Sequence, residues 1–95
     1  MRVRYTPRAR RDLEVIYNYI DLNAQEAAST LKRTIEGRIE LLSEFPFMAP
    51  ETDEPGAYEM SIARYSYQVY YRVEKEEVWI VHIRHARRKP WDGKG

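Results

Sequence analysis

The hydrophobic period of the chain changes once, at a proline-rich segment that spans residues 46–57. Before this segment, apolar residues recur every three or four positions, which is the spacing of amphipathic helices. After it, three short runs rich in Tyr, Val and Ile have the composition of β-strands. The sequence therefore predicts a helical layer followed along the chain by a layer of sheet.

The first helix is predicted over residues 7–21. Thr6-Pro7 suits its start, because a Thr hydroxyl can cap the first turn and a proline at the first helical position loses no hydrogen bond. Its apolar stripe should face a core and consists of Ala9, Leu13, Ile16 and Ile20. Its polar face should face water and includes Arg10, Arg11, Glu14 and Asn18.

The second helix is predicted to begin at Asn23, which has the capping-box spacing to Glu26. It should end at Phe45, because the following Pro46 disfavours the helical conformation of the residue before it. Its core stripe is Ala28, Leu31, Ile35, Ile39 or Leu41, Leu42 and Phe45. Two helices joined by two or three residues must pack antiparallel as a hairpin.

The strands are predicted at the start and in the second half of the chain. Val3 and Tyr5 alternate with arginines, which indicates a short strand, and three further strands are expected at residues 58–62, 67–73 and 78–83. The charged residues 74–77 suggest a tight hairpin between the last two. The order β-α-α-β-β-β predicts an α+β domain over residues 1–91, with the helical hairpin on one face of a small, mostly antiparallel sheet. Residues 92–95 are expected to fray.

Several classes of protein are disfavoured by composition. The chain contains no cysteine, which excludes disulfides and thiolate metal sites and agrees with a reducing compartment. No apolar run approaches the roughly 18 residues of a membrane span, and the basic start is followed by no signal-peptide core, so we expect a cytoplasmic protein without membrane contact. The two histidines, His82 and His85, should point to opposite faces of a continuing strand, so no metal site is expected. No cofactor motif is present.

The charges are segregated although the net charge is only +1. Residues 2–11 hold five arginines, and residues 84–89 hold three arginines and one lysine. Seven acids against one arginine fall between Glu36 and Glu59, where a solvated helix face and loop is the simplest explanation.

Aromatic and guanidinium groups concentrate in two runs, residues 64–72 and 82–91. Five of the eight tyrosines fall between residues 58 and 71. Arginine can bind phosphate or carboxylate and tyrosine can stack on a base, which suits RNA, DNA or an acidic protein surface. Cross-strand packing with arginines over tyrosines explains the same pattern. His85 could be a general base, a hydrogen-bonding contact or a structural residue, and Arg64 could instead pair with the acidic loop.

Three segments of the chain resemble the RelE/ParE toxins, which include proteins described as plasmid stabilisation proteins. The segments are residues 6–14, 64–73 and 81–90, the last reading Val-His-Ile-Arg-His-Ala-Arg-Arg-Lys-Pro. The resemblance implies a helical hairpin on a small antiparallel sheet, as the periodicity does. It also implies a cognate antitoxin that wraps the toxin, and therefore a toxin–antitoxin hetero-oligomer.

Two activities accompany this fold, because RelE-like members cut messenger RNA on the ribosome whereas ParE-like members inhibit DNA gyrase. A metal-independent nuclease would use Arg64, His85, Arg87 and the distant Glu51. Binding to a target would use Arg64, Tyr71, Arg84, His85, Arg87 and Arg88. No Tyr follows Tyr71 and no Lys lies between Lys32 and Lys75, unlike in many nuclease relatives, so gyrase inhibition without enzymatic activity is favoured. A nontoxic binding module with the same fold is the third possibility.

Overall fold

The computed structural model describes residues 1–21 and 25–86 of the chain. Its elements follow the predicted order: β1 (Arg2–Tyr5), α1 (Pro7–Asp21), α2 (Gln25–Glu40), β2 (Ala57–Ile62), β3 (Tyr67–Glu74) and β4 (Glu77–His85). Two short 3-10 helices, η1 (Leu41–Ser43) and η2 (Ala63–Tyr65), follow α2 and β2. The fold class predicted from the sequence, α+β with the order β-α-α-β-β-β, is confirmed. The tail that the sequence assigns to residues 92–95 lies outside the described residues.

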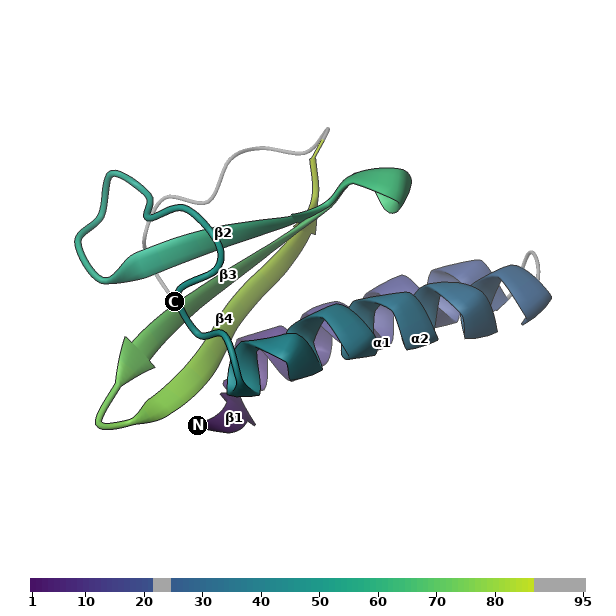
Figure 1. Ribbon diagram of the computed structural model, residues 1–95. Helices are drawn as coiled ribbons and strands as arrows, with labels where there is room; N and C mark the ends of the chain where they lie inside the picture. Colours follow the sequence, from purple (N-terminus) through teal and green to yellow (C-terminus); the bar gives the residue numbers. More distant parts are fainter. Residues whose placement is uncertain (22–24, 87–95) are drawn as a thin grey trace.

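The sheet has the strand order β1-β4-β3-β2 (Figure 1). β2 pairs with β3, and β3 with β4, in antiparallel orientation, whereas β1 lies parallel to β4. The sheet is therefore mostly antiparallel, as predicted. The turn between β3 and β4 consists of Lys75 and Glu76, which both have positive φ, at 50° and 63°. This is the two-residue turn whose twist matches antiparallel strands.

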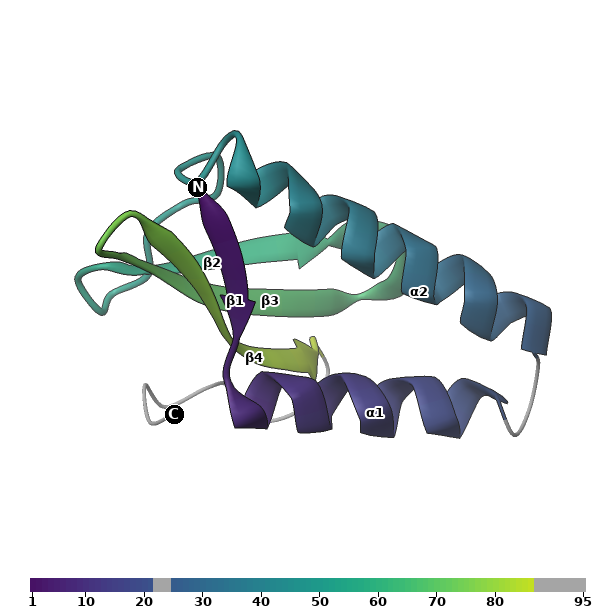
Figure 2. The same ribbon diagram turned by 90° about the horizontal axis from the view of Figure 1, so that it is seen from below.

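The helices form a hairpin that lies on one side of the sheet (Figures 1 and 2). The Thr6 hydroxyl accepts the N–H of Ala9 at 3.1 Å, so the predicted cap begins α1. The same hydroxyl donates to the carbonyl of Val81 at 3.1 Å, which ties the start of the helix to β4. The predicted cap of the second helix at Asn23 lies outside the described residues.

The core fills the space between the hairpin and the sheet. The predicted stripe of the second helix is confirmed, with Ile39 rather than Leu41 facing inward; its buried residues are Ala28, Leu31, Ile35, Ile39 and Leu42. The prediction was wrong at its end, because α2 stops at Glu40 and Phe45 is 56% exposed. The chain tightens into η1 before Pro46, which turns Phe45 away from the core.

A bulge in β4 determines which side chains face the core. Tyr71 is paired with Ile80 but Tyr70 is paired with His82, so Val81 is an extra residue in the strand. The inner face, toward the helices, therefore carries Ile80 and then Ile83, while His82 falls on the outer face beside Tyr70. His82 and His85 lie on opposite faces, as the sequence predicted.

Candidate functional site

A groove opens where the inner face of β3 and β4 meets α1. Its volume is about 550 Å³, within the range of ligand sites. Its walls come from α1 and from the ends of β3 and β4; the lining residues are Arg11, Asp12, Val15, Ile16, Tyr19, Tyr67, Ile83, Arg84 and His85. Val15 and Tyr19 are 53% and 71% exposed. The groove thus combines an apolar surface with cationic side chains.

His85 reaches this groove at the end of β4. Its ring meets the ring of Tyr67 edge to face, with centroids 5.3 Å apart. The N–H of Ala86 then donates to the carbonyl of Ser66 at 2.6 Å, which closes the two strands behind the histidine. Ser66 itself has a positive φ of 58°, a conformation uncommon outside glycine. His85 therefore has a defined position at the mouth of the groove.

Arg84 borders the groove at the end of β4, and its guanidinium donates hydrogen bonds to neutral groups on the outer face of the sheet. Its Nε donates to the Tyr70 hydroxyl at 2.9 Å, and its Nη1 donates to the carbonyls of His85 and Ala86 at 3.1 and 3.3 Å. Burial raises the pKa of Tyr70, a hydrogen bond to Glu59 raises it further, and Arg84 lowers it. The Tyr70 hydroxyl consequently stays protonated at neutral pH.

Asp12 joins α1 to this outer network. One carboxylate oxygen, Oδ2, lies 2.7 Å from Nδ1 of His82 and accepts the N–H of Ile83 at 3.0 Å. The His82 ring stacks on the Tyr70 ring, with centroids 5.9 Å apart. Because β1 ends at Tyr5, β4 has no strand on its β1 side at Ile83, and Asp12 supplies the hydrogen bond there instead.

The acidic half of the chain pairs with other arginines. Arg72 lies 3.4 Å from Glu54, and Arg4 pairs with Glu77. Arg64 is exposed in η2 and its guanidinium lies 5.6 Å from the ring centroid of Tyr65. The acidic loop therefore pairs with Arg72, whereas Arg64 lies in η2, where β2 ends.

The predicted site residues other than Tyr71 fall into three groups. Arg64, Arg84 and His85 lie at one end of the sheet, since Ile62, Tyr67 and His85 are in register. Glu51 bridges to Tyr58 near the opposite end of β2, and its carboxylate accepts the N–H of Gly56 at 2.8 Å. The four steps from Tyr58 to Ile62 correspond to roughly 13 Å of strand, so Glu51 is not brought together with the others. Arg87 and Arg88 lie outside the described residues.

Tyr71 requires a correction, because it was predicted to contact a target. Its side chain is 0% exposed in the core, and its ring stacks on that of Tyr58 with centroids 5.3 Å apart. Burial raises the pKa of its hydroxyl. A side chain in this position packs the inner face and cannot reach a partner.

Sequence reasoning missed the contribution of α1 to the groove. Arg11 belongs to the basic cluster noticed in residues 2–11, but Asp12, Val15 and Tyr19 had no distinguishing pattern. An exposed Val and Tyr on a face that should be polar is the one feature that could have pointed to them. Their role became visible only when the contact between α1 and β4 was known.

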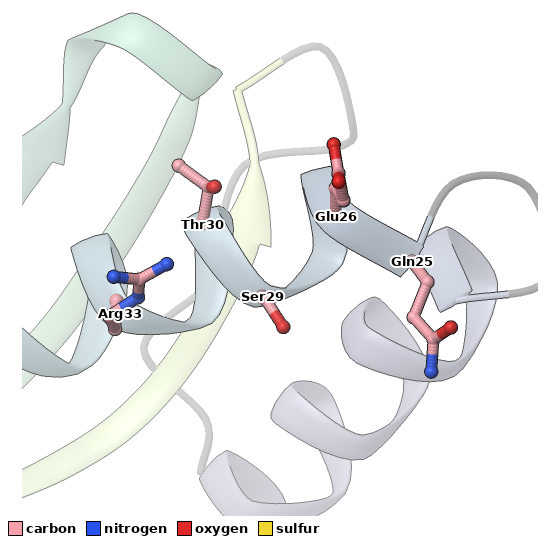
Figure 3. A pocket seen from close by; sticks show the side chains of 5 residues that line it. All are labelled: Gln25, Glu26, Ser29, Thr30 and Arg33. Carbon is pink, nitrogen blue, oxygen red and sulfur yellow. The ribbon is translucent and has the colours of Figure 1, made fainter.

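Other sites are weaker candidates. Figure 3 shows a hollow lined by Gln25, Glu26, Ser29, Thr30 and Arg33, and all five belong to α2. A single exposed helix face does not bring groups from different elements to one point. Within residues 1–21 and 25–86, no group of three His, Asp or Glu side chains could hold a metal ion. Neither helix in the described part of the chain is long and apolar enough to cross a membrane.

Solved structures with a similar arrangement are toxins of toxin–antitoxin systems. A chain of the chromosomal ParDE system of P. aeruginosa aligns with a TM-score of 0.80 and 21% identity, covering 92% of this chain and 97% of that one. The isolated E. coli RelE toxin aligns with a TM-score of 0.69 and 16% identity, covering 93% and 86%. A chain of the RelBE2 toxin–antitoxin complex of Mycobacterium tuberculosis gives 0.58 and 22%, covering 88% and 95%. No curated protein matches the chain.

These likenesses establish the fold, that of the small α+β toxins just named. The family follows from the sequence itself, because residues 3–90 match the model of the ParE toxin of type II toxin–antitoxin systems, parDE. The chain belongs to this ParE toxin family. The resemblance noted from residues 6–14, 64–73 and 81–90 is thereby confirmed.

Proposed function

We propose that this chain is a toxin that inhibits DNA gyrase and is neutralised by a cognate antitoxin. The observation that carries the proposal is the match of residues 3–90 to the ParE toxin family. Gyrase inhibition is the activity that the resemblance to ParE-like toxins implies. Both partners would be cytoplasmic, which agrees with the location expected from the sequence.

The site geometry favours target binding over RNA cleavage. A nuclease built on Arg64, His85 and Glu51 needs the three groups around one phosphodiester, because general acid–base catalysis operates at hydrogen-bond distance. Glu51 lies near the far end of β2 and its carboxylate is bonded to the Gly56 N–H. Arg64 and His85 at the other end are instead suited to contact an anionic surface.

The groove supports the antitoxin half of the proposal. Antitoxins accompany the toxins in the solved ParDE and RelBE structures. In this chain the groove presents Val15, Ile16 and Tyr19 beside Arg11 and His85. Such a surface suits an amphipathic segment with acidic residues, and leaving it bare exposes apolar area to water.

Growth and gyrase assays test the proposal in sequence. Induction of the chain alone should stop growth, and co-expression of the protein encoded beside it should restore growth. Purified chain should make gyrase accumulate cleaved DNA or lose supercoiling, while ribosomes programmed with messenger leave that messenger intact. Normal growth at confirmed soluble expression would favour the nontoxic binding module, and cleaved messenger would establish the ribonuclease instead.

Two substitutions separate contact from catalysis. His85→Ala and Arg64→Ala should each weaken gyrase inhibition by about 1–3 kcal/mol, which is typical of a lost polar contact. A catalytic group would instead cost about 10²–10⁴-fold in rate with binding retained. Lys32→Ala is a matched control, since Lys32 is a cation of α2 that lies over Tyr17, away from the groove.

A further inference from the structure

The side chain of Arg84 binds the backbone at the end of β4. Nη1 of Arg84 donates to the carbonyls of His85 and Ala86, while its Nε donates to the Tyr70 hydroxyl. The guanidinium carbon also lies 5.6 Å from the centroid of the Tyr70 ring. Because the guanidinium is a rigid planar fork, bonds from two of its nitrogens fix its orientation. Arg84 thus links the Tyr70 side chain to the last described peptides of the chain.

Tyr70 is itself immobilised. It is 4% exposed, and its ring stacks on His82, whose Nδ1 is 2.7 Å from the Asp12 carboxylate. Asp12 belongs to α1 and also binds the backbone of β4 at Ile83. The Tyr70 ring is therefore anchored to α1, because it stacks on His82 and His82 contacts Asp12 of that helix.

His85 lies between two restraints as a result. On its ring side it meets Tyr67 at the groove, and on its backbone side its carbonyl accepts Arg84. The following Ala86 is held on both sides too, since its N–H donates to Ser66 and its carbonyl accepts Arg84. A rotation of the peptide between them would change the direction of the imidazole in the groove.

We propose that Arg84 and Tyr70 are positioning residues that hold the peptide of His85 and Ala86, so that the imidazole is presented to the target in one orientation. The sequence had suggested Arg84 as a direct target contact; its three hydrogen bonds assign it this intramolecular role. The inference rests on the proposed gyrase inhibition for the identity of the target. The restraint itself is independent of the target.

Hydrogen exchange tests the restraint directly. The variants are Tyr70→Phe, which keeps the ring but removes the acceptor, and Arg84→Lys, which keeps the charge but removes the fork. The amide of Ala86 should exchange about tenfold faster in both, because Arg84→Lys removes the forked hydrogen bond to the His85 and Ala86 carbonyls and Tyr70→Phe removes the hydroxyl that fixes the orientation of that fork. Tyr17→Phe is the matched control, since it removes a buried tyrosine hydroxyl with no hydrogen-bond partner among the described residues. Unchanged exchange at Ala86 in Tyr70→Phe and Arg84→Lys overturns the proposal.

A double-mutant cycle tests whether the restraint acts through His85. Gyrase inhibition is titrated with wild type, Tyr70→Phe, His85→Ala and the double variant. If Tyr70 positions His85, the loss on His85→Ala should be several-fold smaller in the Tyr70→Phe background than in wild type. Independent, additive losses overturn the positioning role, because a general loss of stability would reduce potency in both backgrounds alike.

The remaining outcomes are also decisive. Loss of inhibition in Arg84→Lys but not in Tyr70→Phe would show that Arg84 contacts the target itself, against the proposal. A wild-type chain without effect on gyrase refutes the proposed function, whereas the exchange of Ala86 still decides the restraint. Faster exchange at Ala86 with full inhibition in both variants would refute the positioning role while leaving the proposed function standing.

Discussion

The two faces of the sheet differ in what holds their side chains. The inner face is apolar, and Val69, Tyr71 and Ile80 on it are fully buried against the helices. On the outer face, Tyr70, His82 and Arg84 are joined by ring stacking and hydrogen bonds. The inner face therefore supplies the buried apolar contacts that stabilise the fold, while the hydrogen bonds of the outer face hold the backbone at the end of β4.

The bulge at Val81 is what allows one strand to serve both purposes. Strict alternation from Val78 through Ile80 would place His82 inward, in an apolar core. The extra residue places His82 beside Tyr70 and within reach of Asp12 instead. It also keeps Ile83 and His85 on the inner face, where they line the groove.

The largest effect on stability should come from the inner face. Ile80→Ala should lower the free energy of unfolding by about 2–5 kcal/mol, because a fully buried side chain leaves a cavity. Gln68→Ala, on the outer face of the neighbouring strand, removes a surface hydrogen bond from Ser61 and should lower it by only about 0.5–1.5 kcal/mol. Urea unfolding of both variants measures the contrast. Equal midpoints would show that the faces have been assigned wrongly.

The next effect should come from the link between the outer face and α1. Asp12→Ala removes the acceptor of the Ile83 N–H and the partner of His82, so the unfolding free energy should fall by about 1–3 kcal/mol. Glu14→Ala on the exposed side of α1 is the control and should be nearly neutral. A loss no greater than that of the control would mean that the outer network is not a stabilising unit.

The sequence predicted the elements well, because a helix or strand is determined by local periodicity and by caps such as Thr6. It selected Arg64, Arg84 and His85 as candidate site residues, and the register of the strands brings them to one end of the sheet. It could not identify Asp12, whose contact with His82 joins residues 70 positions apart. It also misjudged Tyr71, because Tyr70 and Tyr71 are adjacent and only the register decides which of them faces the core.

Alkaline pH should lower the stability of the protein through tyrosines on both faces of the sheet, whereas Ile80→Ala and Asp12→Ala each act on one. Burial raises the pKa of Tyr71 on the inner face and of Tyr70 on the outer face above 10.0. A raised pKa favours the protonated folded state, so this stabilisation is complete below pH 10 and is lost as the pH rises through the folded-state values. Urea unfolding between pH 9 and 12 should show stability falling above about pH 10. Tyr70→Phe and Tyr71→Phe should each make the stability fall less steeply with pH. If only one of them does, the alkaline effect belongs to a single face of the sheet.

The smallest effect, and the only stabilising one, should come from the turn that sets the register of both faces. Lys75 and Glu76 occupy the left-handed region, which costs a residue with a side chain roughly 1–2 kcal/mol relative to the right-handed one. Glu76→Gly relieves this strain but adds backbone freedom to the unfolded chain, so a net gain of about 0.5–1 kcal/mol is expected. The same substitution at Glu74, which lies in β3, should destabilise the protein because its backbone is already extended. If Glu76→Gly gives no gain in the urea midpoint, the strain at this position is no larger than the backbone freedom that glycine adds to the unfolded chain. The turn would then hold Glu74 opposite Glu77, and with it the pairing of Tyr71 with Ile80 that separates the two faces, at no net cost.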